Sequence, residues 1–210
     1  MSNRAPPQRE LPPWEPKTRL GLQVAQGTIT SLEEIFQNGW KLKEGEIVRA
    51  LVPDIRDVVI NVGIVQKQTD AGEMTRFAAI VAIGNDAGWF GLGRGKARQM
   101  RSAIDKGINE ALLHTIPIKL GCGSWECKCD KLHSIPVKAV GKAGSVRVEI
   151  YPGPRGLGLV AGEKVKRLLS LAGVKDAWTK TYGATSTASS VANAVYDAFK
   201  QTHRFTTTTG

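Results

Sequence analysis

The sequence predicts an α+β protein built of two successive units. Residues 77–83 form an apolar run, residues 145–150 alternate between apolar and polar side chains, and apolar side chains recur three and four positions apart between 97 and 112. The first two patterns indicate strands and the third indicates a helix. At 210 residues, 41% hydrophobic and 23% charged, the chain can bury a core, so wholesale disorder is excluded.

Residues 1–50 are expected to form an extended arm with one short helix. Five prolines between positions 6 and 16 oppose a regular helix, and we expect the extended conformation to continue to residue 27. Ser31 and Glu34 have the spacing of a capping box, and Gly39 is suited to ending a helix. The short helix is therefore predicted at 31–38.

Residues 51–117 are expected to form the first unit, a sheet of three antiparallel strands with one helix. The strands are predicted at 56–66, 77–83 and 89–93, with a polar loop over 66–75. The apolar stripe places the helix at about 96–114.

A Cys-rich insertion at 118–134 separates this unit from a second one at 135–202, and residues 203–210 form a tail. In the second unit, strands are predicted at 135–140, 145–150 and 174–179. Helices are predicted at 161–172, before the third of these strands, and at 187–200, after it.

The charge of the chain favours a polyanionic partner. Lys and Arg number 29 against 19 Asp and Glu, a net charge of +10, and residues 1–60 are neutral, so the whole excess lies beyond residue 60. Nucleic acid fits this field, as do a membrane surface or an acidic partner. No run of 18 apolar residues exists, which argues against a membrane-spanning helix, and the polar start of the chain argues against secretion.

Residues 91–96 (GLGRGK) lie at the predicted junction between a strand and a helix. Glycine amides and a helix N-terminus can approach a phosphate, and Arg94, Lys96, Arg98 and Arg101 add positive charge nearby. A nucleotide-binding P-loop is not favoured, because the spacing fails at both of its ends. A nucleic-acid backbone and a merely solvated first helical turn remain the two interpretations.

Residues 156–161 (GLGLVA) fit the glycine pattern of dinucleotide-binding proteins. Asp176 follows 20 residues after the first glycine, where a ribose-binding carboxylate would lie. Against this, the segment PGPR intervenes after the strand and no second half of such a domain follows. The alternatives are a further basic loop, with Arg155 and then Lys164, Lys166 and Arg167, or an ordinary tight turn.

Cys122, Cys127, Cys129 and His133 form a potential ligand set for one zinc ion. Three thiolates and an imidazole complete a tetrahedral shell, which leaves no position for water and indicates a structural rather than a catalytic site. The alternative is three reduced, buried thiols beside an exposed histidine. All three cysteines of the chain lie here, which suits a reducing cytosol better than a disulfide scaffold.

No catalytic constellation is present, since the chain has three histidines and no paired-carboxylate or nucleophile motif. Aromatic residues make up only 6% of the chain, so contacts to phosphate and to RNA shape are favoured over base stacking.

Residues 75–84 and 88–96 resemble the N-terminal half of the family of the fifth protein of the small ribosomal subunit, and residues 152–158, 171–174 and 182–183 resemble its C-terminal half. The insertion at 121–129 (GCGSWECKC) resembles the archaeal branch. The resemblance implies a double-stranded-RNA-binding-like N-terminal domain followed by a βαβ-containing two-layer C-terminal domain.

The resemblance further implies a non-enzymatic protein of the cytoplasmic ribosome that binds small-subunit ribosomal RNA and supports assembly and decoding fidelity. It implies contacts with the fourth and eighth proteins of the small subunit, a place at the messenger RNA entry channel, and no membrane association. The candidate RNA-binding residues are Lys67, Arg76, Arg94, Lys96, Arg98, Arg101, Arg155, Lys164, Lys166 and Arg167. Two alternatives stay open: a nicotinamide- or nucleotide-binding enzyme that uses 156–161, and a zinc-stabilised nucleic-acid module outside the ribosome.

Overall fold

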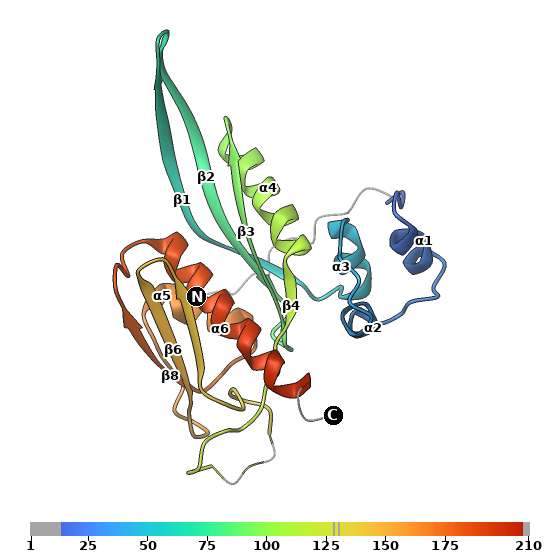
Figure 1. Ribbon diagram of the computed structural model, residues 1–210, viewed down its shortest axis with the longest axis vertical. Helices are drawn as coiled ribbons and strands as arrows, with labels where there is room; N and C mark the ends of the chain where they lie inside the picture. The colour runs from blue at the N-terminus through green and yellow to red at the C-terminus, as the bar shows by residue number, and fades with distance from the viewer. Residues whose placement is uncertain (1–13, 128, 130, 208–210) are drawn as a thin grey trace, which may run out of the picture.

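The computed structural model describes residues 14–127, 129 and 131–207. Two β-sheets, each with helices packed on it, lie side by side, and a long hairpin projects from the first sheet (Figure 1). Three short helices pack together beside the first sheet (Figure 1). The expected extended conformation of residues 1–13 and the end of the expected tail, 208–210, lie outside the described residues.

The N-terminal segment contains three short helices, α1 (Arg19–Ala25), α2 (Leu32–Gln37) and α3 (Gly45–Leu51). The helix predicted at 31–38 is confirmed as α2: Ser31 caps it, and Gly39 follows it with a φ of +68°. The extended conformation predicted up to residue 27 is wrong for α1. No proline follows position 16 there, and the Thr18 hydroxyl accepts a hydrogen bond from the Gly21 amide, so this helix forms with its own cap.

The N-terminal sheet has four antiparallel strands in the order β1-β2-β3-β4, one more than the sequence predicted. They are β1 (Arg56–Thr69), β2 (Gly72–Gly84), β3 (Trp89–Ala97) and β4 (Thr115–Pro117). Helix α4 (Met100–Leu113) covers one face. The fourth strand has only three residues, too short for a hydrophobic pattern to reveal it.

The polar loop predicted at 66–75 is wrong, because β1 and β2 continue through it as a paired hairpin. Thr69 pairs with Gly72, so the turn shrinks to two residues between them. Side chains from 66 to 76 are polar or exposed on both faces, so the strands carry no apolar alternation there. Backbone pairing with the partner strand forms the ladder instead.

Strand β3 runs to Ala97, and α4 begins only at Met100, so the glycines of 91–96 are not at the start of a helix. A Cβ atom on Gly93 would lie 2.2 Å from the carbonyl oxygen of Gly107, and one on Gly95 would lie 1.7 Å from that of Ala103. These glycines let strand and helix approach backbone to backbone.

The C-terminal sheet has the order β5-β6-β8-β7, and its last pair is parallel. Its elements are β5 (Ala139–Ala143), β6 (Val146–Pro152), β7 (Leu159–Val160), α5 (Glu163–Leu171), β8 (Ala177–Tyr182) and α6 (Ala188–Thr207). The expected βαβ arrangement is present as β7-α5-β8. Helix α6 extends past its predicted end at 200 and takes in much of the expected tail.

Two strands of this sheet begin three or four residues later than predicted. The strand expected from 174 starts at Ala177, because Gly173, with a φ of +89°, and Val174 cap the end of α5. The strand expected from 135 starts at Ala139, because Ile135 instead accepts a backbone hydrogen bond from Gly123 of the insertion.

The two halves of the chain share one hydrophobic core. The sheet face away from α4 contributes Ile80, Phe90 and Leu92 to a cluster completed by β5, β6, α5 and α6. Phe90 packs edge-on against Phe199 of α6, with ring centroids 5.0 Å apart. The opposite sheet face packs on α4 and the N-terminal helices in a second cluster.

Candidate nucleic-acid interface and metal centre

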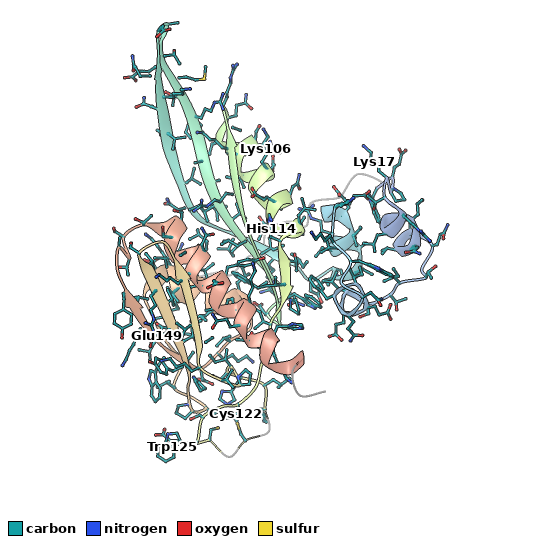
Figure 2. The ribbon with its side chains drawn as sticks, viewed as in Figure 1. Lys17, Lys106, His114, Cys122, Trp125 and Glu149 are labelled. Carbon is teal, nitrogen blue, oxygen red and sulfur yellow. The ribbon has the colours of Figure 1, made fainter. Side chains whose placement is uncertain are left out.

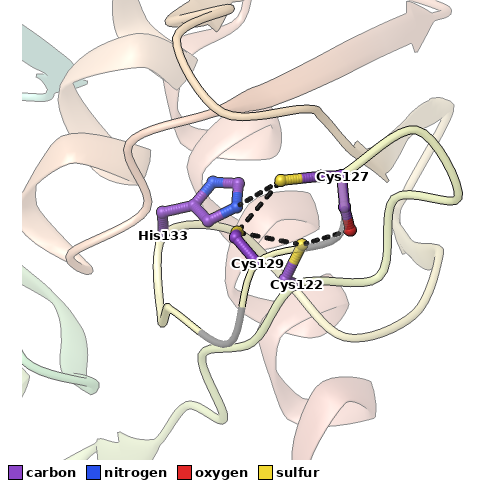
Figure 3. Close-up of side chains that lie close together, drawn as sticks. All are labelled: Cys122, Cys127, Cys129 and His133. Carbon is purple, nitrogen blue, oxygen red and sulfur yellow. Dashed lines mark hydrogen bonds between the residues drawn. The ribbon is translucent and has the colours of Figure 1, made fainter.

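Cys122, Cys127, Cys129 and His133 lie together (Figure 3), and Figure 2 places Cys122 at the end of the C-terminal half away from the β1–β2 hairpin. The four ligand atoms all lie within 4.8 Å of one another, although no regular element carries them. The three thiols are half-buried, and the imidazole is buried. The exposed histidine of the alternative interpretation is therefore wrong.

The spacing of these atoms fits a tetrahedral zinc shell. Zinc–sulfur bonds of about 2.3 Å place two sulfurs about 3.8 Å apart. The Cys122 and Cys129 sulfurs are 3.7 Å apart, and the Cys127 sulfur is 3.7 Å from Nε2 of His133. The closest two sulfurs, of Cys127 and Cys129, are 3.0 Å apart, and none of the three cysteines forms a disulfide.

The local environment favours a thiolate at Cys127. Hydrogen bonding from the Cys129 thiol and from the Arg155 backbone lowers the pKa of Cys127 to about 6. Burial raises the pKa of Cys122, an effect that a bound cation would oppose. A thiolate is the form that binds a metal.

A buried carboxylate supports the histidine. Nδ1 of His133 lies 2.8 Å from Oδ2 of Asp176, and both side chains are more than nine-tenths buried. The arrangement is that of a metal-binding histidine oriented by a carboxylate behind it. Sequence reasoning missed this role, because 43 residues separate the two positions and no local spacing links them.

The same Asp176 holds the glycine loop at 153–158. Its Oδ1 accepts a hydrogen bond from the Gly158 amide at 2.7 Å. Gly156 and Gly158 have φ values of +86° and +74°, which a side chain would disfavour. Both carboxylate oxygens are thus engaged within the protein, and neither is available to a ribose.

Four of the predicted RNA-binding side chains share one face of the N-terminal sheet. Strand pairing sets Lys67 opposite Met74, Arg76 opposite Val65, Arg94 opposite Ile80 and Lys96 opposite Ala78. The even-numbered residues of β2 point away from α4, since the odd-numbered ones pack against it. We call Lys67, Arg76, Arg94 and Lys96 the open sheet face. All four are exposed, and none forms an ion pair within the part of the chain that the structure describes.

The remaining predicted basic residues lie at three other places. Arg98 and Arg101 are exposed at the start of α4, whose first turn holds no acidic residue. Arg155 is exposed at the tip of the glycine loop. On α5, Lys166 is exposed, whereas Lys164 bonds the Ser186 carbonyl and Arg167 pairs with Glu163.

An aromatic groove of about 510 Å³ lies beside the metal cluster, and no local sequence pattern indicates it. Trp125, Tyr151, Trp178 and Lys180 line it together with the neighbouring backbone. Trp125 is 89% exposed and stands out at the end of the insertion (Figure 2). The three aromatic rings that line the groove come from three separate segments of the chain, so the groove becomes evident only in the folded structure.

Comparison with known proteins identifies the family. Residues 55–119 match the model of the ribosomal protein S5 N-terminal domain, and residues 141–208 match that of its C-terminal domain. Small ribosomal subunit protein uS5 of Cenarchaeum symbiosum is 57% identical, with 92% of this chain and 89% of the relative covered. The uS5 proteins of Pyrobaculum arsenaticum and Aeropyrum pernix are 52% and 50% identical, with 91% and 99% of this chain and 95% of each relative covered.

The chain belongs to the uS5 family of small ribosomal subunit proteins. It is a structural constituent of the ribosome and not an enzyme. The alternatives of a dinucleotide-binding enzyme and of a module outside the ribosome are therefore wrong. The resemblance to the archaeal branch and the α+β fold class are confirmed.

Family membership and geometry together correct the interpretation of both glycine motifs in this uS5 chain. The glycines of 91–96 serve close packing of β3 on α4, and those of 156–158 serve a turn fixed by Asp176. Neither is a nucleotide cradle. Within the part of the chain that the structure describes, no helix has the length and apolar character needed to span a bilayer.

Proposed function

We propose that this chain binds small-subunit ribosomal RNA chiefly through its sugar–phosphate backbone. The observation that carries the proposal is the open sheet face, where Lys67, Arg76, Arg94 and Lys96 stand exposed and without ion-pair partners among the described residues. Cations without an internal partner can neutralise phosphates without first losing one, and Arg94 and Lys96 lie on β3, where the sheet has three paired strands. Arg98, Arg101, Arg155, Lys164, Lys166 and Arg167 extend the proposed contact along α4, the glycine loop and α5.

Membership of the uS5 family supports further proposals about the partners and the role of this chain. We propose contacts with the fourth and eighth proteins of the small subunit, a position at the messenger entry channel, and support of assembly and decoding fidelity. The aromatic groove supports a covered surface in the assembly, since exposed aromatic patches mark interaction sites. We also propose that residues 51–117 and 135–202 act as two RNA-binding domains, flanked by the arm 1–50 and the tail 203–210 and joined through the insertion 118–134.

A salt titration of the full chain with transcribed small-subunit ribosomal RNA tests the binding mode. Each phosphate contact contributes about 0.7–0.9 to the slope of log affinity against log salt. The double substitution Arg94→Ala and Lys96→Ala should lower that slope by about 1.5. Lys106→Ala is the matched control, because Lys106 is exposed on α4, on the other side of the sheet (Figure 2). A flat titration, or equal effects of both variants, would contradict the proposal.

We further propose that Cys122, Cys127, Cys129 and His133 bind one structural zinc ion. Two donor distances of 3.7 Å that match a zinc shell, the convergence of all four ligand atoms within 4.8 Å, and the carboxylate behind His133 support it. Metal analysis of the purified full chain should give about one zinc per chain. Cys127→Ser should lose the metal, whereas Ser124→Ala in the same loop should keep it. Metal-free protein with three freely titrating thiols would rule out the site.

A further inference from the structure

We propose that Asp176 is a positioning residue that couples the metal cluster to the glycine loop 153–158, so that zinc orders this loop. The inference rests on the proposed function, since it takes the cluster to bind zinc and Arg155 of the loop to contact RNA. In this proposal, the carboxylate of Asp176 transmits the presence of zinc to the loop that contacts RNA.

The two oxygens of Asp176 divide between the two sites. Oδ2 accepts a hydrogen bond from Nδ1 of His133 at 2.8 Å, while Nε2 of that ring faces the Cys127 sulfur. Metal binding at Nε2 fixes the proton on Nδ1 and thereby makes His133 a permanent donor to Asp176. Oδ1 meanwhile accepts from the Gly158 amide at 2.7 Å. The orientation of this carboxylate therefore depends on the imidazole.

Further hydrogen bonds tie the Gly153 end of the loop, and the segment 175–176, to residues 133 and 134. The amides of Lys175 and Asp176 donate to the His133 carbonyl at 2.9 and 3.1 Å. The Ser134 hydroxyl donates to the Asp176 carbonyl and accepts from the Gly153 amide at 3.2 Å. The loop is thus anchored at Gly153 by Ser134, the neighbour of the ligand His133, and at Gly158 by Asp176, which in turn bonds His133.

The insertion has little structure of its own to hold His133 in place. Its described residues form one isolated bridge, between Gly121 and Ser134, and no helix or strand. The four ligand atoms of this irregular segment converge within 4.8 Å of one another, so a single cation bound to them would join them into one unit. A bound metal is the element that fixes the insertion, and His133, Asp176 and Gly158 carry that constraint to the loop.

Hydrogen exchange followed by mass spectrometry on the full chain tests the coupling directly. Wild-type protein is compared when loaded with zinc and after removal of zinc by a chelator. We expect peptides covering 153–160 to exchange about tenfold faster after chelation, as the loss of one charge-assisted hydrogen bond implies. Peptides from the paired strands β5 and β6 serve as the internal reference and should change little.

Asp176→Asn separates positioning from general stability. An amide has a single acceptor oxygen, so it cannot serve both His133 and Gly158. We expect zinc affinity to fall about 10- to 100-fold and the zinc response of loop exchange to disappear. Asp197→Asn is the matched control: Asp197 also accepts from a backbone amide, that of Lys142 at 3.1 Å, but among the described residues it bonds neither His133 nor the glycine loop.

The outcomes of these experiments distinguish the coupling from the two proposals on which it rests, the zinc site and the RNA-binding role. Loop exchange that is unchanged by zinc in the wild type overturns the coupling, without any need for a variant. Asp176→Asn that keeps both zinc affinity and the zinc response also overturns it. A chain that binds no zinc overturns the metal site and the coupling together. A zinc-dependent loop in a chain that fails to bind ribosomal RNA supports the coupling and removes the RNA role.

Discussion

Gly95 of β3 and Ala103 of α4 touch through their backbones: a Cβ atom on Gly95 would lie 1.7 Å from the Ala103 carbonyl oxygen. Gly91 and Gly93 approach the same helix in the same way, because a Cβ atom on either would lie 2.3 or 2.2 Å from a backbone carbonyl oxygen of α4. The alternate glycines of β3 therefore set the distance between the sheet and α4. Side chains on the other face of β3 remain free to pack in the shared core or to form the open sheet face.

Gly95→Ala should destabilise the protein by about 3 kcal/mol, near the upper end of overpacking effects, because the obstructing atoms are backbone and cannot rotate away. Chemical denaturation of the full chain measures this change. Gly63→Ala in β1 is the control, since a Cβ there meets nothing within 4 Å and φ is ordinary. Equal stability of the two variants would show that β3 and α4 can move apart without cost.

Phe90→Ala should cost about 3–5 kcal/mol and weaken both halves of the chain together. The side chain is fully buried and packs on Phe199 of α6, so both sheets depend on it. Thermal unfolding should remain a single transition at a lower temperature. Met100→Ala, at a side chain that is 52% exposed, should have little effect. Separate transitions for the two halves would contradict a shared core.

Glu149 should stabilise the protein in a manner that depends on pH. Hydrogen bonds from Tyr151 and Lys138 lower the pKa of this carboxyl below its ordinary value. Its contribution is complete above the unfolded-state pKa of about 4.3 and is lost as pH falls through the lower folded-state pKa. Glu149→Gln should therefore unfold at a lower temperature than wild type at pH 7, and this difference in melting temperature should shrink below about pH 4.

Thermal denaturation between pH 3 and pH 8 gives the comparison for Glu149. Glu163→Gln is the control, because that carboxylate is exposed and its one ion pair among the described residues is with Arg167 on the helix surface. A difference between Glu149→Gln and wild type that stays constant across this range would contradict the expected loss of stabilisation at low pH.

Zinc should raise the free energy of unfolding in proportion to the logarithm of its free concentration, once that concentration exceeds the dissociation constant. A ligand that binds only the folded state adds about 1.4 kcal/mol for each tenfold increase above its dissociation constant. Denaturation in zinc buffers should show this slope in wild type and in Ser124→Ala, and Cys127→Ser should lose it. The same slope in all three would mean that zinc acts elsewhere than at the cluster.

Local patterns predicted the elements whose signals are local. The capping residue Ser31 marked α2, the alternation at 145–150 marked β6, and the close spacing of the cysteines marked the candidate ligands. Each of these signals is contained within a dozen residues of sequence. The order of elements and the fold class followed from them.

Relationships across the chain were not predictable in this way. A glycine in sequence does not reveal whether it serves a turn, as Gly158 does, or a close packing contact, as Gly95 does. Asp176 lies 43 residues from His133, and its position after a glycine motif indicated a ribose contact instead. Only tertiary packing brings such groups together.

The β1–β2 hairpin extends beyond β3, whose last residue, Ala97, pairs with Phe77 (Figure 1). Past that point two strands stand alone; Met74 is exposed there, and Ile64, which pairs with Phe77 at the boundary, is exposed as well. An isolated two-stranded ribbon is only marginally stable in water. We therefore expect this ribbon to be loosely ordered in the free protein and to become ordered when the protein binds in the subunit. Part of the binding free energy would then be spent on ordering the ribbon. Protection of the ribbon amides from solvent exchange should consequently increase as the subunit assembles.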